Sequence, residues 1–123
     1  MRKGAGNEVA GLAALSPPGA RLSKHCRHSR PHDSYLAVDD QGHTIKWTSR
    51  KKRKDCFLRV DDITGIRLGM NTPVLMRHGK AHRANRYFSI ITQDRTLDLE
   101  TPTEDARNDL VAAIDFLRKH SEL

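Results

Sequence analysis

Five consecutive cations at residues 50–54 are the densest group of side chains in this sequence that could bind a ligand. They follow an alternating apolar segment that contains Trp47, the only tryptophan, and they precede Phe57 and Leu58. A basic run between two strand-like segments indicates a charged loop held beside a core. Guanidinium and ammonium groups in such a loop would bind negative charge through charge-assisted hydrogen bonds.

The charge of the whole chain favours the same chemistry. The 123 residues, enough for one domain with a buried core, carry 22 Lys and Arg against 15 Asp and Glu, a formal net charge of +7. Residues 1–54 hold 12 Lys or Arg and 4 Asp or Glu, whereas residues 55–123 hold 10 and 11. We therefore expect an anionic partner, which could be a nucleic acid, a membrane surface or an acidic protein.

Metal and nucleophilic chemistry have less support. His25, Cys26, His28 and His32 could suggest zinc, but their spacing matches no standard zinc site. No acid–base partner or oxyanion element is identifiable for a cysteine nucleophile. The two thiols, Cys26 and Cys56, indicate a reduced cytoplasmic setting, and no apolar run approaches the ~20 residues that a membrane span needs. We expect no metal, no cofactor and no enzymatic activity.

A helix is predicted near each end of the chain. Asn7 is a suitable N-cap for a helix over Glu8–Leu15, and Pro17 and Pro18 would end it. Its apolar face would be Val9, Leu12 and Ala13. Near the C-terminus, Thr103 is a good N-cap for a longer helix. The apolar stripe of that helix would consist of Ala106, Leu110, Ala113, Ile114 and Leu117.

Between the helices, alternation and turn residues predict about seven strands. The last two form the clearest hairpin, in which Leu97 and Leu99 would point inward while Asp98 and Glu100 point outward. Gly65 suggests a bulge, and the long connection at 69–85 carries three cations, no acid and spacing that allows one helical turn. The strands are expected at Ala20–His25, 35–38, 44–48, 56–60, Ile63–Leu68, Tyr87–Thr92 and Thr96–Glu100.

Three segments resemble the pleckstrin homology (PH) domain of phosphoinositide-specific phospholipases C. They are PPGARLSKHCRHSRPHDSYLAV, DITGIRLGMNTPVL and RYFSIITQDRTLDLETPTEDA. They also resemble the PH domains of plant proteins with chromosome-condensation-type repeats and a FYVE finger. The resemblance implies a mainly β fold, a partly open seven-stranded barrel or sandwich of two near-orthogonal antiparallel sheets capped by the C-terminal helix. It divides the chain into an extension with a short helix at 1–18, the PH domain at 19–120 and a tail at 121–123.

The same resemblance implies a headgroup site at the open end of the barrel. One residue departs from the family pattern, because His32 stands where the strongest phosphoinositide binders have an arginine that could donate two hydrogen bonds. The terminal helix also lacks the family's tryptophan, with Leu110 as the nearest counterpart. The implied phosphoinositide-binding residues are Lys24, Arg27, Arg30, His32, Ser49, Arg50, Lys51 and Thr96, and the implied membrane rim is Lys52, Arg53 and Lys54.

The resemblance and the charge together predict a non-catalytic membrane-targeting adaptor, cytoplasmic and peripherally membrane-associated, that binds phosphoinositide headgroups and anionic lipid. Cations near an anionic leaflet contribute about 1 kcal/mol each, so residues 50–54 could supply about 3–5 kcal/mol. An alternative is a PH-fold protein-interaction module that binds an acidic partner without headgroup specificity. The basic run could also be a solvated loop or a localisation-type stretch. Nucleic acid is not expected, because no aromatic residues are interleaved with the basic runs.

Overall fold

The computed structural model describes residues 6–49 and 55–120 of the chain. The predicted helices and strands are all present, and the second strand begins three residues earlier than expected. A second helix and a 3-10 helix lie in the long connection between the fifth and sixth strands. The elements are α1 (Glu8–Leu15), β1 (Ala20–His25), β2 (His32–Val38), β3 (Thr44–Ser49), β4 (Asp55–Arg59), η1 (Val60–Asp62), β5 (Ile63–Leu68), α2 (Pro73–His78), η2 (Ala81–Arg86), β6 (Tyr87–Thr92), β7 (Thr96–Glu100) and α3 (Glu104–His120).

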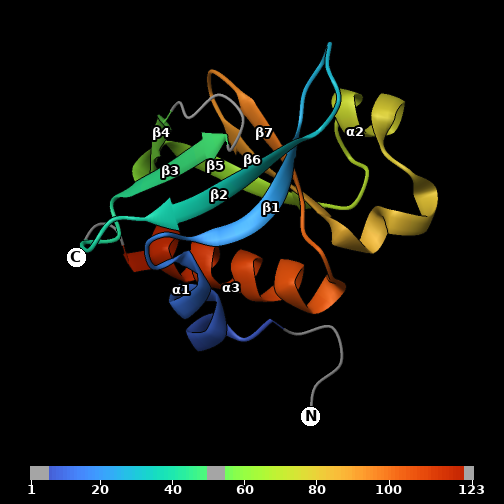
Figure 1. The fold of residues 1–123 in the computed structure, drawn as a ribbon. Coiled ribbons are helices and arrows are strands. Elements are labelled where there is room, and N and C mark those ends of the chain that lie inside the picture. The colour runs from blue at the N-terminus through green and yellow to red at the C-terminus, as the bar shows by residue number, and fades with distance from the viewer. Residues whose placement is uncertain (1–5, 50–54, 121–123) are drawn as a thin grey trace.

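The seven strands form one antiparallel sheet with the order β4-β3-β2-β1-β7-β6-β5. Two meanders, β1–β4 and β5–β7, are joined where β1 pairs with β7. The strands β1–β3 cross in front of β6 and β7, and α3 lies beneath the sheet (Figure 1). The sheet stays open at β4 and β5, which are its two edges. This is the open seven-stranded fold with a capping helix that the sequence predicted, and the expected bulge lies between Ile63 and Gly65.

The inner face of the sheet carries the core. We use "inner face" for the side on which Leu22, Leu36 and Trp47 are buried, and "outer face" for the opposite side. Alternation along each strand sends every second side chain to the inner face, where the stripe of α3 predicted from helical spacing covers it. Within that stripe Leu110, Ala113 and Ile114 are buried, each at 2% exposure or less. Burying one large apolar side chain contributes about 1.5–3 kcal/mol, so Leu110 and Ile114 hold α3 on the sheet.

The helix α1 packs through a face that shares only Leu12 with the one predicted. Its cap is as expected, since Asn7 Oδ1 accepts a hydrogen bond from the Ala10 N–H at 3.0 Å. The buried residues, however, are Gly11 and Leu15, while Val9 is 75% exposed. Gly11 lies against the backbone of α3, where a Cβ built on it would be 2.0 Å from the carbonyl oxygen of Asp109. Apolar spacing missed this face because a residue without a side chain makes the closest contact.

Gly11→Ala should destabilise the fold. Alanine is favoured over glycine in a helix by about 1 kcal/mol, so without the contact the substitution would be stabilising. We expect a net loss of about 1–3 kcal/mol in the free energy of unfolding, because α1 must move away from α3. Chemical denaturation measures it. Gly65→Ala is the control, since a Cβ there meets nothing within 4 Å. If Gly11→Ala proved as stable as the unmodified chain, the close packing would be refuted.

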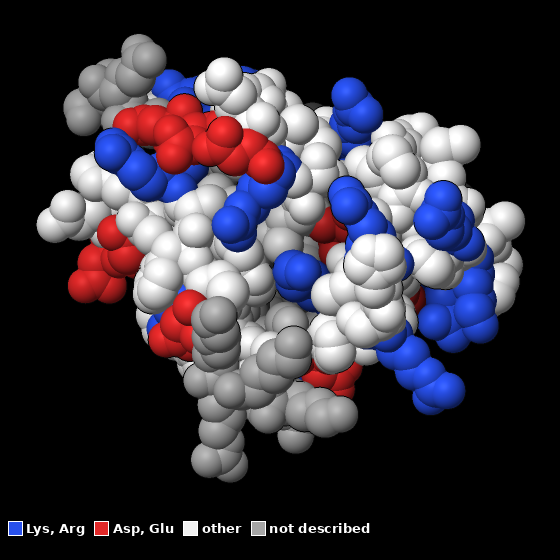
Figure 2. Space-filling view, turned by 90° about the horizontal axis from the view of Figure 1, so that it is seen from above, with Lys and Arg blue, Asp and Glu red and all other residues white. Residues whose placement is uncertain are grey.

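The connection between β5 and β6 folds over the outer face. Its residues Thr72 and Leu75 are buried there, and so are His25 of β1 and Asp98 of β7. The expectation that Asp98 points away from the core is therefore correct, but the side chain is only 3% exposed, because α2 covers it. Lys and Arg side chains gather on the side of the molecule that carries α2, as Figure 2 shows from above.

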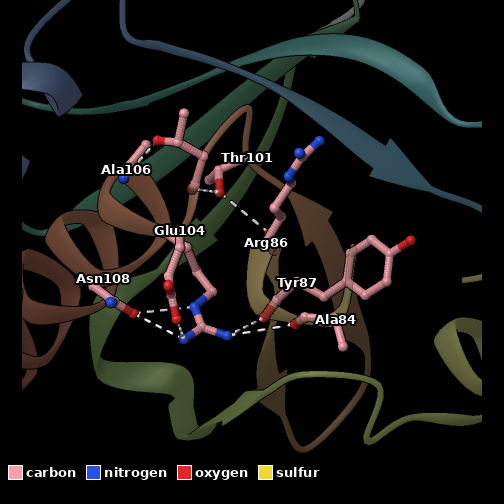
Figure 3. Close-up of polar contacts among 9 residues, drawn as sticks. Ala84, Arg86, Tyr87, Thr101, Glu104, Ala106 and Asn108 are labelled. Atoms are coloured by element: carbon pink, nitrogen blue, oxygen red, sulfur yellow. Dashed lines mark hydrogen bonds and ion pairs between the residues drawn. The ribbon is translucent and has the colours of Figure 1, made fainter. Parts of the chain in front are cut away.

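Arg107, buried on α3, ties the end of this connection to the helix. Figure 3 shows Ala84, Tyr87 and Asn108, which accept its hydrogen bonds. Its Nη1 donates to the carbonyl oxygens of Ala84 and Tyr87, at 3.5 Å each. Its Nε and Nη2 donate to Asn108 Oδ1 at 3.1 and 2.9 Å. Beside it, the Thr101 N–H donates to the carbonyl oxygen of Arg86 at 2.9 Å. The position of η2 is thus set by the first turns of α3.

Arg107→Met should loosen η2 more than it loosens the core. Methionine keeps the length of the side chain but removes the donors, so the carbonyl groups of Ala84 and Tyr87 lose their contact with the guanidinium. We expect a stability loss of about 1–3 kcal/mol. Hydrogen exchange should become faster in residues 81–87 first. Lys119→Met, at an exposed site on the same helix, is the control, and equal exchange in both variants would contradict the proposed tie.

Candidate functional site

The basic run at residues 50–54 is located in the fold only through the residues on either side of it. Arg50, Lys51, Lys52, Arg53 and Lys54 lie outside the described residues. Ser49 ends β3 and Asp55 begins β4, so the run occupies the connection between these two antiparallel strands. The described part of the candidate site consists of the residues that neighbour this connection at the same end of the sheet.

Four polar side chains share the inner face at this end. The register places Lys24 opposite His32 across β1 and β2, and Ser34 opposite Ser49 across β2 and β3. Directly opposed residues have Cβ atoms about 4.5–5.5 Å apart. Each of the four is an even number of positions from a core residue of its own strand and therefore points to the same face; Lys24, for example, is two positions after Leu22. We call Lys24, His32, Ser34 and Ser49 the inner-face cluster.

The polar contacts of the cluster leave its cation available. Lys24 Nζ donates to the sulfur of Cys26 at 3.6 Å, and Lys24 forms no ion pair with any described carboxylate. His32 Nε2 lies 3.1 Å from Ser29 Oγ in the β1–β2 loop. Lys24, His32 and Ser49 are half-buried, whereas Ser34 is buried. An anion arriving at this end would therefore meet an ammonium group whose charge no described acid compensates.

Arg95 is a cation at this end that the sequence analysis did not assign to a site. It belongs to the turn between β6 and β7, and its guanidinium carbon lies 5.6 Å from the centre of the Trp47 ring. A guanidinium over an indole face is held by a cation–π interaction. Trp47 is two residues before Ser49 on the inner face, so Arg95 reaches towards the cluster. Nothing local in the sequence could reveal this, because the contact joins a turn to a strand 48 residues away.

The other predicted site residues lie elsewhere. Arg27 and Thr96 line a cavity of about 780 Å³ between the β1–β2 loop, α2 and the β6–β7 turn. Thr96 has the same parity as Asp98, which also lines this cavity, and the opposite parity to the core residue Leu97. It is thus on the outer face, and the structure does not bring it to Lys24. Arg30 is exposed in the β1–β2 loop.

Neither protein-family models nor curated proteins give a match to this sequence, whereas solved structures do. The N-terminal PH domain of human ARAP2 has a TM-score of 0.63 at 17% identity, covering 85% of this chain and 80% of that one. The chain has the pleckstrin homology fold. ISP3, an inner membrane complex sub-compartment protein of Toxoplasma gondii, matches this PH fold with a TM-score of 0.69 at 12% identity, covering 94% of this chain and 85% of that one.

PLC21 of L. pealei matches the PH fold over 78% of this chain and 15% of its own length, with a TM-score of 0.56 at 13% identity. The sequence predicted a likeness to the PH domain of phosphoinositide-specific phospholipases C, and that likeness is confirmed at the level of the fold. PH domains generally bind phosphoinositides or proteins and are generally non-catalytic.

The described residues contain neither a metal-ligand cluster nor a helix that could cross a bilayer. Across residues 6–49 and 55–120, no three His, Cys, Asp or Glu side chains are grouped so that they could hold a metal ion. No helix within the same ranges is both long and apolar enough to span a bilayer.

Proposed function

We propose that this PH domain is a membrane-targeting adaptor that binds phosphoinositide headgroups through its inner-face cluster and the basic run that follows it. The observation that carries the proposal is the register, which sets Lys24 against His32 and Ser34 against Ser49 at the end of β3 where the five cations begin. Lys24, Ser49, Arg50 and Lys51 would contact phosphates. No described acidic residue belongs to the cluster, and Asp33, the nearest in β2, has outer-face parity.

The chemistry of an inositol polyphosphate suits such a cluster. Its phosphates concentrate several negative charges in a small volume, and an ammonium group with adjacent hydroxyls can form charge-assisted hydrogen bonds to them. The rim residues Lys52, Arg53 and Lys54 would then meet bulk anionic lipid, each contributing about 1 kcal/mol. Arg27 and Arg30 belong to the β1–β2 loop, and their charges would strengthen attraction to the same leaflet. The domain would associate with the cytoplasmic face of a membrane.

His32 favours a second candidate function. An imidazole cannot form the two parallel hydrogen bonds that a guanidinium gives to one phosphate. Lys24, which lies opposite His32, is the only lysine or arginine among the four residues of the inner-face cluster. The same surface could therefore hold the carboxylates of an acidic protein instead. Vesicle binding separates these alternatives.

Loss of the cluster's cations should weaken binding to phosphoinositide vesicles. We expect Lys24→Ala combined with Lys51→Ala to raise the apparent Kd by about tenfold or more for vesicles containing phosphatidylinositol bisphosphate, because two charge-assisted contacts are lost. Vesicles with phosphatidylserine at the same total charge should respond less. Sedimentation measures both. Lys46→Ala with Lys119→Ala removes equal charge elsewhere, and an equal loss in that control would reduce the proposal to general electrostatic attraction.

Adding an arginine at position 32 should strengthen headgroup binding. His32→Arg places a second permanent cation opposite Lys24 and supplies paired donors for one phosphate. We expect the apparent Kd for phosphatidylinositol bisphosphate vesicles to fall by about tenfold, because the arginine adds a charge-assisted hydrogen bond to a phosphate. His43→Arg, in the exposed turn at the other end of β2, adds the same charge and should change little. Equal effects of the two substitutions would argue against a site at the cluster.

A further inference from the structure

We propose that the outer-face cavity is a second, separate site that binds a short acidic segment of a partner protein. It opens between the β1–β2 loop, α2 and the β6–β7 turn and has a volume of about 780 Å³. That size accommodates a few residues of an extended peptide. The proposal does not rest on headgroup binding, because this cavity is on the other side of the sheet from Lys24.

The walls of the cavity supply cations from two elements. Arg27 comes from the β1–β2 loop and Arg77 from α2, with His78 beside it; Arg95 of the β6–β7 turn also lines the cavity, but its guanidinium lies over the ring of Trp47. Arg27 and Arg77 are exposed, and neither forms an ion pair with a described carboxylate. Arginine is the side chain best suited to hold carboxylates, since its planar fork donates two parallel hydrogen bonds. The walls therefore favour a ligand with separated acidic groups.

The floor of the cavity distinguishes a peptide from a polyphosphate. Asp98 is 3% exposed and lines the cavity, and its Oδ1 accepts hydrogen bonds from Thr72 Oγ1 at 2.6 Å and from Ser89 Oγ at 2.7 Å. A second acid, Asp94, lies at the turn. Like charges in a site cost free energy, so a ligand with several phosphates would be repelled by these carboxylates. A peptide brings backbone N–H donors as well as acidic side chains, and it can match both signs.

The cavity is also preorganised and partly apolar. His78 Nε2 lies 3.1 Å from the carbonyl oxygen of Arg27, which joins α2 to the β1–β2 loop. The Lys80 N–H donates to the hydroxyl of the buried Tyr87 at 2.8 Å, which fixes the chain just after α2. Because these contacts fix the cavity walls before a ligand arrives, less conformational entropy is lost on binding. Pro73 and Val74 form an apolar part of the lining, so the segment should carry an apolar residue between its acids.

The test uses two synthetic peptides and one inositol phosphate. The probe is an acetylated and amidated peptide of three Glu-Leu repeats, the matched control has Gln in place of Glu, and the third ligand is inositol hexakisphosphate. Amide chemical shifts are followed by NMR on the full chain. The Glu-Leu peptide should shift the amides of Val74, Thr96 and Asp98. The Gln-Leu peptide should not. Inositol hexakisphosphate should shift the amides of Lys24 and His32 instead.

Substitution on the cavity wall gives the second readout. Arg77→Glu should weaken the Glu-Leu peptide by about fivefold or more, whereas Arg59→Glu, the same charge change on an exposed residue of β4, should not. Vesicle binding should be equal in these two variants, so failure of this proposal is distinguishable from failure of headgroup binding. The proposal is overturned if the Glu-Leu peptide shifts only the inner-face cluster, if Arg77→Glu and Arg59→Glu weaken it equally, or if inositol hexakisphosphate binds the cavity more tightly.

Discussion

The buried carboxylate of Asp98 is the constraint on which the outer half of this PH fold depends. A carboxylate removed from water is costly unless hydrogen bonds compensate it. Here the hydroxyls of Thr72, just before α2, and Ser89, on β6, supply them at 2.6 and 2.7 Å. Those lengths are typical of hydroxyls that donate to a carboxylate. The same contacts that satisfy the acid therefore place α2 on the sheet, and with it the walls of the outer-face cavity.

The sequence predicted the elements well, because local signals determine them. The hairpin Tyr87–Thr92 and Thr96–Glu100 alternates cleanly, and the caps Asn7 and Thr103 begin their helices as expected, with Ala106 N–H donating to Thr103 Oγ1 at 3.1 Å. Local signals could not reveal which outward residues would be covered. Asp98 has the pattern of a solvent-facing residue, and it is buried because a connection more than 20 residues earlier in the chain folds over it. The role of Arg107 was missed for the same reason, since two of its partners are the carbonyl groups of Ala84 and Tyr87, at least 20 residues earlier in the chain.

For the site, the sequence named candidate residues but could not decide which face of the sheet they occupy. Lys24 and its neighbour His25 point to opposite sides, as do Thr96 and Leu97, because side chains alternate along a strand. The register brings Lys24, His32 and Ser49 to one face, while Arg27 and Thr96 line the cavity behind it. Register and loop position depend on the whole fold, which residue spacing alone does not determine. Under the two proposals made above, one small sheet would present two binding surfaces that do not compete for a ligand.

The contact at Gly11 bears on how this sequence can drift over evolution. Position 11 is held by the backbone of a helix about 100 residues away in sequence, at Asp109, so any residue larger than glycine displaces a whole element. Val9, two positions earlier and 75% exposed, carries no such restriction. Among descendants of this chain, we expect position 9 to vary freely, although its valine has the pattern of a core residue, and we expect Gly11 to persist. A shared glycine at such a position would be a better sign of common ancestry than overall sequence identity. That identity is only 12% to ISP3 and 17% to the ARAP2 domain, although the folds are similar.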